Sequence, residues 1–98
     1  MNMQNLMAQA QKMQRDITKK KEELDKTEFS GKSEWVEVVF YGNRELKTIK
    51  ILKDDIKDSD DKEMLEDMIK IAINDSISKI NKEMENKMSM YGGMNGLI

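Results

Sequence analysis

The 98-residue sequence contains no cysteine, no histidine and no proline. Without cysteine and histidine, the chain has no disulfide or zinc–thiolate site and lacks the most common nucleophiles and proton shuttles of enzymes. Catalysis would have to use carboxylate, lysine, tyrosine or serine side chains. We therefore expect neither an enzyme nor a bound cofactor, and catalysis is the least favoured class of function.

Long hydrophobic runs are missing as well. No stretch of about 18 apolar residues is present to cross a bilayer, and the start of the sequence lacks the apolar run of a signal peptide. These absences predict a cytoplasmic protein with no membrane partner. Aromatic residues make up 5% of the chain and charged residues 37%, a composition typical of long solvated helices. Because a single domain of this length buries only a modest core, self-association is expected.

The formal net charge is −2, which argues against simple electrostatic attachment to nucleic acid. The charges are unevenly spread: residues 1–27 carry a net +2, residues 28–57 are balanced, and residues 58–98 carry a net −4. The positive excess therefore lies in the first segment. The basic residues there are Lys12, Arg15, Lys19, Lys20, Lys21 and Lys26.

Lys12, Arg15 and Lys19 are spaced three and four residues apart, so they share one face of a helix. On a projecting helix this face and the other three basic residues are candidates for contact with DNA phosphates. The alternative is a solvated face balanced by its acidic neighbours, and the charges alone favour it. Those neighbours are Asp16, Glu22, Glu23 and Asp25. A weaker second set of candidate DNA contacts comprises Lys79, Lys82 and Lys87.

Apolar residues at steps of three and four predict a first helix over residues 2–25, which would be roughly 36 Å long. They are Met3, Leu6, Ala10, Met13, Ile17 and Leu24, and Lys20 interrupts the seam. The rest of the chain is too short to cover such a helix. We therefore expect residues 1–26 to project into solvent or to contact another chain.

A second long helix is predicted over residues 59–90, because apolar side chains recur at helical spacing from Leu65 to Met84. Asp60 is expected to cap its N-terminus, with Glu63 completing a capping box. The glycine pair at residues 92 and 93 predicts the end of the helix, and residues 91–98 are expected to form a mobile tail.

Between the helices, residues 27–52 carry the signals of a three-stranded antiparallel sheet. The expected strands cover residues 27–30, 34–41 and 45–51. The first strand is expected to end at Gly31. The Gly42-Asn43 pair between the other two suits a two-residue hairpin turn, since both residues tolerate positive φ.

Strand alternation places Val36, Val38 and Phe40 on one face of the sheet. The opposite face carries Trp35, Val39 and Tyr41. Because both faces are partly apolar, we expect helices to cover one face and a partner chain to cover part of the other. The predicted dimer interface comprises Val36, Val38, Phe40, Ile49, Ile51, Leu65, Ile69 and Ile73.

Three further features allow both a functional and a structural interpretation. The acidic cluster at residues 54–61 lacks the glycine and closing glutamate of an EF-hand and is interrupted by lysine, so a solvated capping loop is favoured over a Ca²⁺ site and no metal is expected. The ten methionines indicate helix packing rather than a promiscuous binding surface. Trp35 is interpreted as a packing residue rather than one that stacks on a base.

Three segments of the sequence resemble the YbaB/EbfC family of small bacterial nucleoid-associated proteins in order and spacing. They are LMAQAQKMQ at residues 6–14, GNRELKTIKI at residues 42–51, and DKEMLEDMI at residues 61–69 followed by Asn74-Asp75. The resemblance covers nearly the whole chain. It departs from the family at Lys32-Ser33-Glu34-Trp35, where a glycine-rich segment is expected.

The resemblance implies an α+β fold with a long N-terminal helix, a three-stranded antiparallel sheet and a long C-terminal helix. It also implies an intertwined, tweezer-like homodimer whose helical arms engage double-stranded DNA. The expected function is DNA binding of low sequence specificity through phosphates, contributing to nucleoid organisation and gene expression. The alternative is a homodimeric interaction module that acts through recombination or replication proteins.

Overall fold

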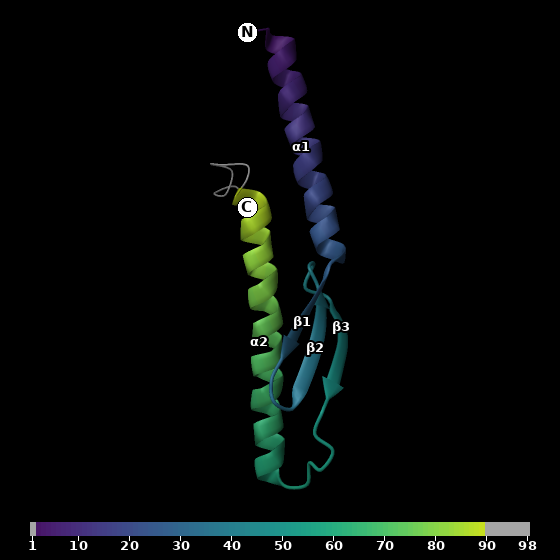
Figure 1. Ribbon diagram of the computed structural model, residues 1–98, viewed down its shortest axis with the longest axis vertical. Coiled ribbons are helices and arrows are strands. Elements are labelled where there is room, and N and C mark those ends of the chain that lie inside the picture. Colours follow the sequence, from purple (N-terminus) through teal and green to yellow (C-terminus); the bar gives the residue numbers. More distant parts are fainter. Residues whose placement is uncertain (1, 90–98) are drawn as a thin grey trace.

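The computed structural model describes residues 2–89 and shows two long helices joined by a three-stranded sheet (Figure 1). The elements are α1 Met3–Lys26, β1 Glu28–Lys32, β2 Val36–Tyr41, β3 Leu46–Ile51 and α2 Ser59–Ser89. The strands pair antiparallel in the order β1-β2-β3. The predicted α+β fold is confirmed. The chain is elongated, with extents of 71 × 20 × 14 Å, and the tail expected at residues 91–98 lies outside the described residues.

Most of the first helix extends away from the rest of the molecule, and only its C-terminal end reaches the sheet (Figure 1). Its N-cap is Asn2, whose side chain accepts a hydrogen bond from the backbone N–H of Gln4 at 3.0 Å. Residues 3–19 of α1, called the arm below, are exposed apart from the half-buried Ile17, and they extend beyond the sheet (Figure 1). Near the other end of α1, Leu24 is fully buried. This residue ties the helix to the body, which is formed by the sheet and α2.

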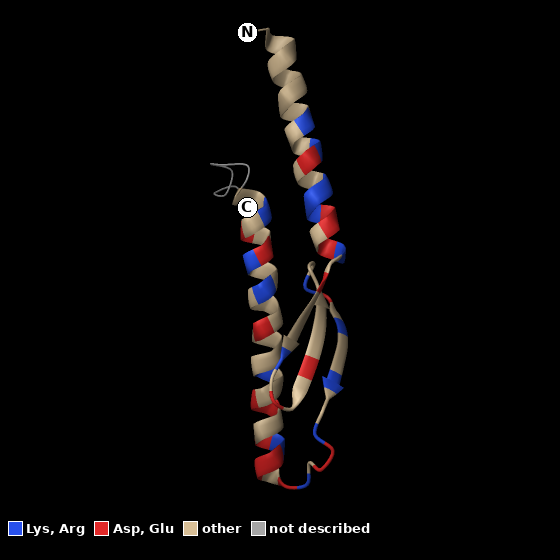
Figure 2. Ribbon diagram, viewed as in Figure 1, with Lys and Arg blue, Asp and Glu red and all other residues tan. Residues whose placement is uncertain are grey.

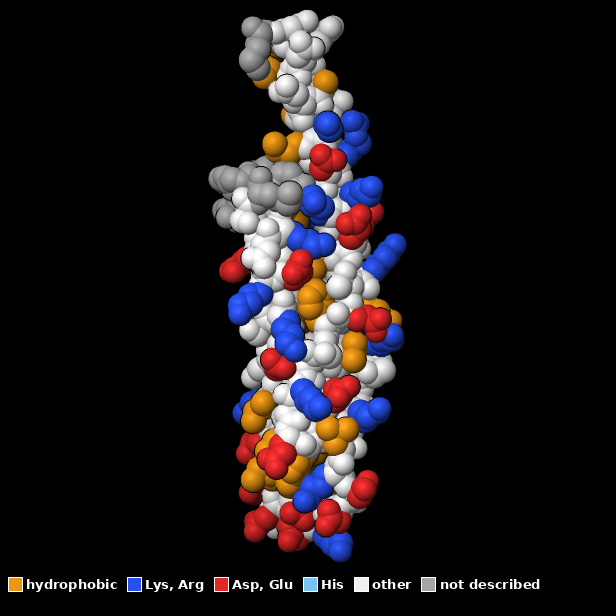
Figure 3. Space-filling view, in the orientation of Figure 1, with side chains coloured by type: hydrophobic (Ala, Val, Ile, Leu, Met, Phe, Trp, Pro, Cys, Tyr) orange, Lys and Arg blue, Asp and Glu red, His pale blue; other side chains and the backbone are white. Residues whose placement is uncertain are grey.

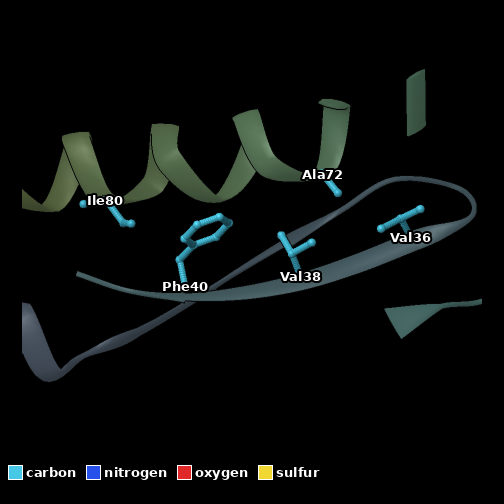
Figure 4. Close-up of a cluster of buried hydrophobic side chains, with 5 residues drawn as sticks. All are labelled: Val36, Val38, Phe40, Ala72 and Ile80. Carbon is cyan, nitrogen blue, oxygen red and sulfur yellow. The ribbon is translucent and has the colours of Figure 1, made fainter. Parts of the chain in front are cut away.

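The core of the body lies between α2 and one face of the sheet. Val36, Val38 and Phe40 alternate along β2 and point toward α2, as the sequence predicts (Figure 4). They meet Ala72 and Ile80 from the helix, and four of these five side chains are completely buried. Burying a side chain of this size contributes about 1.5–3 kcal/mol, so this small cluster carries much of the hydrophobic stabilisation of the body.

At one point β1 and α2 approach each other too closely for any side chain between them. A Cβ atom at Gly31 would lie 2.0 Å from the carbonyl oxygen of Ala72, so only glycine fits. The adjacent Ser76 hydroxyl donates a hydrogen bond of 2.8 Å to the carbonyl of Phe29. Gly31 therefore lies inside β1 and does not end the strand, contrary to the sequence-based prediction, because α2 covers this part of the strand.

The hairpin between β2 and β3 has a three-residue loop, not the predicted two-residue turn. The backbone N–H of Tyr41 donates to the carbonyl of Glu45, and Arg44 is the residue with positive φ, at 71°. A three-residue loop commonly ends with one residue in this left-handed conformation. Gly42 is needed for a different reason: its Cβ would lie 1.8 Å from the carbonyl oxygen of Leu24. The hairpin thus packs directly on the end of α1.

The N-terminus of α2 is capped by Asp58, not by the predicted Asp60. The carboxylate of Asp58 accepts a hydrogen bond of 2.8 Å from the backbone N–H of Asp61. In return, the carboxylate of Asp61 accepts one of 3.2 Å from the backbone N–H of Lys57. The first bond satisfies an N–H group that the helix itself leaves unpaired, and the second holds the loop before the helix, which starts at Ser59.

The third strand lies outside the cover of α2, which packs on β1 and β2 (Figure 1). A bulge places Leu46 opposite Phe40 and Thr48 opposite Val39, so Lys47 is the extra residue on β3. Beyond the bulge, Ile49 and Ile51 lie opposite Val38 and Val36, on the helix-facing side of the sheet. These side chains remain 48% exposed, so the body has an apolar edge that α2 does not cover.

Candidate nucleic-acid interface

The arm presents its basic residues on the side opposite its apolar seam. At about 100° per residue, Lys12, Arg15 and Lys19 project in nearly the same direction, and Lys26 continues their line. We call these four residues the basic stripe. The seam residues, such as Leu6, project in the opposite direction. Figure 2 shows the basic positions, in blue, beginning partway along α1 and continuing to its C-terminal end.

The basic stripe is free of ion pairs within the residues that the structure describes. The ion pairs found there join Lys47 to Glu28, Lys53 to Asp55, and Lys79 to Asp75. None of them involves α1, so the neighbouring carboxylates of the helix do not neutralise the stripe by direct contact. All four side chains of the stripe are exposed, as is Lys21, whereas Lys20 is half-buried on the seam side. The stripe is therefore open to an anionic partner.

The second set of candidate contacts, on α2, is engaged differently. The Lys79 ammonium donates a hydrogen bond of 2.8 Å to the carbonyl of Ser30 and lies 3.5 Å from the Asp75 carboxylate. Asp75 in turn accepts a hydrogen bond from the backbone N–H of Lys32. These contacts hold α2 on β1. Lys82 is exposed and Lys87 is half-buried, so Lys82 is the more accessible cation of this set.

Other cations that sequence reasoning did not select are engaged within the body. The Lys47 ammonium pairs with Glu28 and lies 5.9 Å from the centre of the Tyr41 ring. The hydrogen bond and the charge of Glu28 raise the pKa of Lys47 above its ordinary value of 10.5. Arg44 donates to the side-chain oxygen of Asn81 and so links the hairpin to α2. No local sequence signal identifies these partners, because each lies on a different element.

Trp35 and the acidic loop show mainly structural contacts. Trp35 packs against the core cluster, and the Lys53 ammonium lies 4.4 Å from the centre of its ring. In the acidic loop, Asp58 and Asp61 cap α2. Among residues 2–89 there is no group of three or more metal-ligating side chains that could hold a metal ion.

The predicted dimer-interface residues fall into three groups within one chain. Val36, Val38 and Phe40 are buried under α2, and Leu65, Ile69 and Ile73 are partly buried against the same cluster. Ile49 and Ile51 are half-exposed and continue into the exposed Leu46 and Leu52. Figure 3 shows hydrophobic side chains at the surface of the lower half of the molecule and along the arm. The bare apolar surface of the body thus includes a run along β3 and Leu52, together with Met64 and Ile71 on α2.

Neither helix, over the described residues, is long and apolar enough to span a membrane. The arm and the body together present two kinds of uncovered surface. One is the basic stripe, and the other is apolar, made up of the seam of the arm and the edge of the body formed by Leu46, Ile49, Ile51 and Leu52.

Comparison with known proteins gives a consistent result over nearly the full length. Residues 1–94 match the sequence model of the YbaB/EbfC DNA-binding family. The chain is 44% identical to nucleoid-associated protein LL0120 of Lactococcus lactis, over 93% of each sequence. It is 41% identical to a nucleoid-associated protein of Enterococcus faecalis, over 92% of this chain and 88% of that one. The crystal structure of uncharacterized protein HP0035 from Helicobacter pylori matches with a TM-score of 0.73 and 26% identity, covering 94% of this chain and 99% of that one.

Proposed function

The chain belongs to the YbaB/EbfC DNA-binding family, and we propose that it binds double-stranded DNA as a homodimer, mainly through phosphate contacts and with low sequence specificity. The observation that carries this proposal is the basic stripe on the arm, which is exposed and free of ion pairs among the described residues. Relatives at about 40% identity are named nucleoid-associated proteins, which supports a place at the nucleoid and a contribution to its organisation and to gene expression.

Phosphate contact suits the geometry of the stripe. From Lys12 to Lys19 the helix rises about 10 Å, which is comparable to the width of a DNA groove. Long, flexible cationic side chains along this length can reach phosphates without a defined base sequence, because every duplex presents the same phosphate spacing. The weak net charge of the chain is then no obstacle, since the acidic residues lie mainly on α2 and in the loop before it (Figure 2).

The homodimer is proposed from the apolar edge of the body. Leu46, Ile49 and Ile51 are 46–48% exposed on a strand whose helix-facing side α2 leaves uncovered. A second copy that covers this edge would bury these side chains and bring two arms into one particle. Sedimentation at micromolar concentration should then give roughly 23 kDa, twice the 11.4 kDa of one chain. A single species at the chain mass would contradict the dimer.

A salt titration tests the DNA contact. Each phosphate contact releases about one counterion, so the slope of log affinity against log salt should fall by roughly one for each contact removed. The Lys12→Ala/Arg15→Ala/Lys19→Ala variant should therefore bind every duplex more weakly and with a shallower slope. The matched control removes three exposed lysines at the other end of the molecule, Lys57, Lys62 and Lys70.

The two variants lose the same net charge, so equal weakening in both would show only a general charge effect. A wild-type slope retained by the arm variant would exclude the stripe as the contact. If the wild-type protein binds no duplex even at low salt, the alternative gains support. That alternative is an interaction module for recombination or replication proteins, and the exposed seam residues Met3, Leu6 and Met13 favour it.

A further inference from the structure

The outer half of the arm carries no charge. Residues 3–11 contain no Lys, Arg, Asp or Glu, although 37% of the whole chain is charged, and every one of these residues is exposed. In Figure 2 this half of α1 is tan throughout, with no basic or acidic position. Its polar groups are side-chain amides instead, on Gln4, Asn5, Gln9 and Gln11. This exposed, uncharged segment can therefore contact a partner through hydrogen bonds of its amide side chains.

Of these amides, those of Gln4 and Asn5 lie nearest the line of the basic stripe, while that of Gln11 lies beside Gln4 and farther from the line. At about 100° per residue, Gln4 and Asn5 flank the line through Lys12 and Arg15, and Ala8 lies between them on that line. The small Ala8 side chain lets the helix surface approach a partner closely at this point. Gln9 and Gln14 project to other sides of the helix. One face of the arm thus carries amides in its first turn and cations from its third turn onward.

Amides in the first turn followed by cations from the third turn suit a helix that enters the major groove of DNA. The major groove admits an α-helix, and amide side chains pair in bidentate fashion with the N6 and N7 atoms of adenine. In helices that bind this way, residues near the N-terminus contact base edges while other side chains contact the backbone. From Gln4 to Arg15 the arm rises about 17 Å, the length of roughly five base pairs.

We infer that Gln4 and Asn5 contact adenine edges in the major groove and give the protein a modest preference for adenine-containing duplexes. The inference rests on the proposed DNA contact of the basic stripe and adds a sequence preference to it. We assign Gln4 and Asn5 to contact with duplex DNA because they lie on the same face as the basic stripe, whose charge is complementary to phosphate. The preference is limited to the few base pairs that two amides reach, so binding remains broad.

The test compares three duplexes of equal length at one salt concentration: adenine-rich, G·C-only, and the adenine-rich sequence with 7-deazaadenine, which lacks the N7 acceptor. Wild-type protein should bind the adenine-rich duplex about fivefold more tightly than either of the others, which corresponds to one bidentate contact. The Gln4→Ala/Asn5→Ala variant should lose this preference and keep the wild-type salt slope. The matched control, Gln9→Ala/Gln14→Ala, should retain the preference.

Alanine is a stronger helix former than glutamine or asparagine, so circular dichroism should show intact helix in both variants. Equal wild-type affinity for adenine and 7-deazaadenine duplexes would overturn the inference but leave the phosphate contact standing. Loss of the preference in the control as well would also overturn it. A change in sedimentation of the Gln4/Asn5 variant, with its base preference unchanged, would assign the face to contact between copies of the chain. If wild-type protein binds no duplex at low salt, the proposed function and this inference both fail.

Discussion

The arm and the body differ in how their side chains are covered. Along residues 3–19 only Ile17 is even half-buried, whereas Val36, Val38, Ala72, Ser76 and Ile80 of the body are completely buried. The arm remains helical because it continues a helix anchored at Leu24 and is rich in residues with high helix propensity, such as Ala, Gln, Met and Lys. Stability therefore resides in the body. The exposed face of the arm is free to serve binding, since its side chains support no packing.

The largest effect is expected from a charge placed in the core. Val38→Asp puts a carboxylate without a partner between β2 and α2, at a position that is 0% exposed. Burial of an unpaired charge is among the most destabilising single changes, so we expect a loss of more than about 4 kcal/mol and no folded chain. Circular dichroism and sedimentation should show unfolding and loss of the dimer together. Thr48→Asp, an exposed position of the same sheet, is the control and should fold.

A somewhat smaller loss is expected from filling the contact between β1 and α2. Gly31→Val would place side-chain atoms against the backbone of Ala72 and Ser76, which cannot move without shifting α2. Overpacking of this kind typically costs about 1–3 kcal/mol, and contact with two backbone atoms of α2 favours the upper end. Urea unfolding measures the change. The neighbouring Ser30→Val should cost far less, because Ser30 is exposed, and an equal loss there would mean that strand propensity, not packing, is responsible.

Removal of one buried hydrogen bond should have an intermediate effect. Ser76→Ala deletes the donor to the Phe29 carbonyl at a site that is 0% exposed. Loss of this hydrogen bond should cost about 0.5–1.5 kcal/mol in unfolding free energy. Ser78→Ala on the exposed side of α2 is the matched control. Equal stability of the two variants would show that the Ser76 bond contributes nothing net.

The ion pair of Lys47 should make a small contribution that depends on pH. Because Glu28 raises the pKa of Lys47 in the folded chain, the stabilisation is complete below the ordinary value of 10.5 and is lost as pH rises through the folded value. Wild-type stability should therefore fall more steeply than that of Glu28→Gln when pH is raised across this range. Parallel curves for the two proteins would show that the pair has no energetic effect, as is common for exposed ion pairs.

Features that depend on local periodicity were predictable from the sequence. Alternation along residues 36–41 placed Val36, Val38 and Phe40 together on one face of β2, and the structure buries that face under α2. The spacing of Lys12, Arg15 and Lys19 identified the basic face of α1 in the same way. Both predictions use only neighbours along the chain, and the structure places these residues accordingly.

Features that depend on contacts between distant elements were not predictable. Gly42 was assigned to a turn that needs positive φ, but it is required by the carbonyl of Leu24, and Arg44 takes the positive φ. The contact of the Lys79 ammonium with the carbonyl of Ser30 could not be foreseen, because it arises only where β1 passes beside α2. The cap of α2 was misplaced for a different reason: several aspartates in the loop could serve, and only the path of the loop selects Asp58.

The smallest effect on stability is expected from substitutions in the arm. This result would distinguish the arm from the body most clearly. Lys12→Ala/Arg15→Ala/Lys19→Ala removes three exposed side chains that form no ion pair within residues 2–89. Exposed substitutions away from special features usually change stability by less than about 0.5 kcal/mol, and alanine slightly favours helix. The urea unfolding curve should therefore overlay that of the wild type, even though DNA affinity falls. A loss of more than about 1 kcal/mol would mean that the arm packs on a second chain through its basic face, and the separation between a stabilising body and a binding arm would no longer hold.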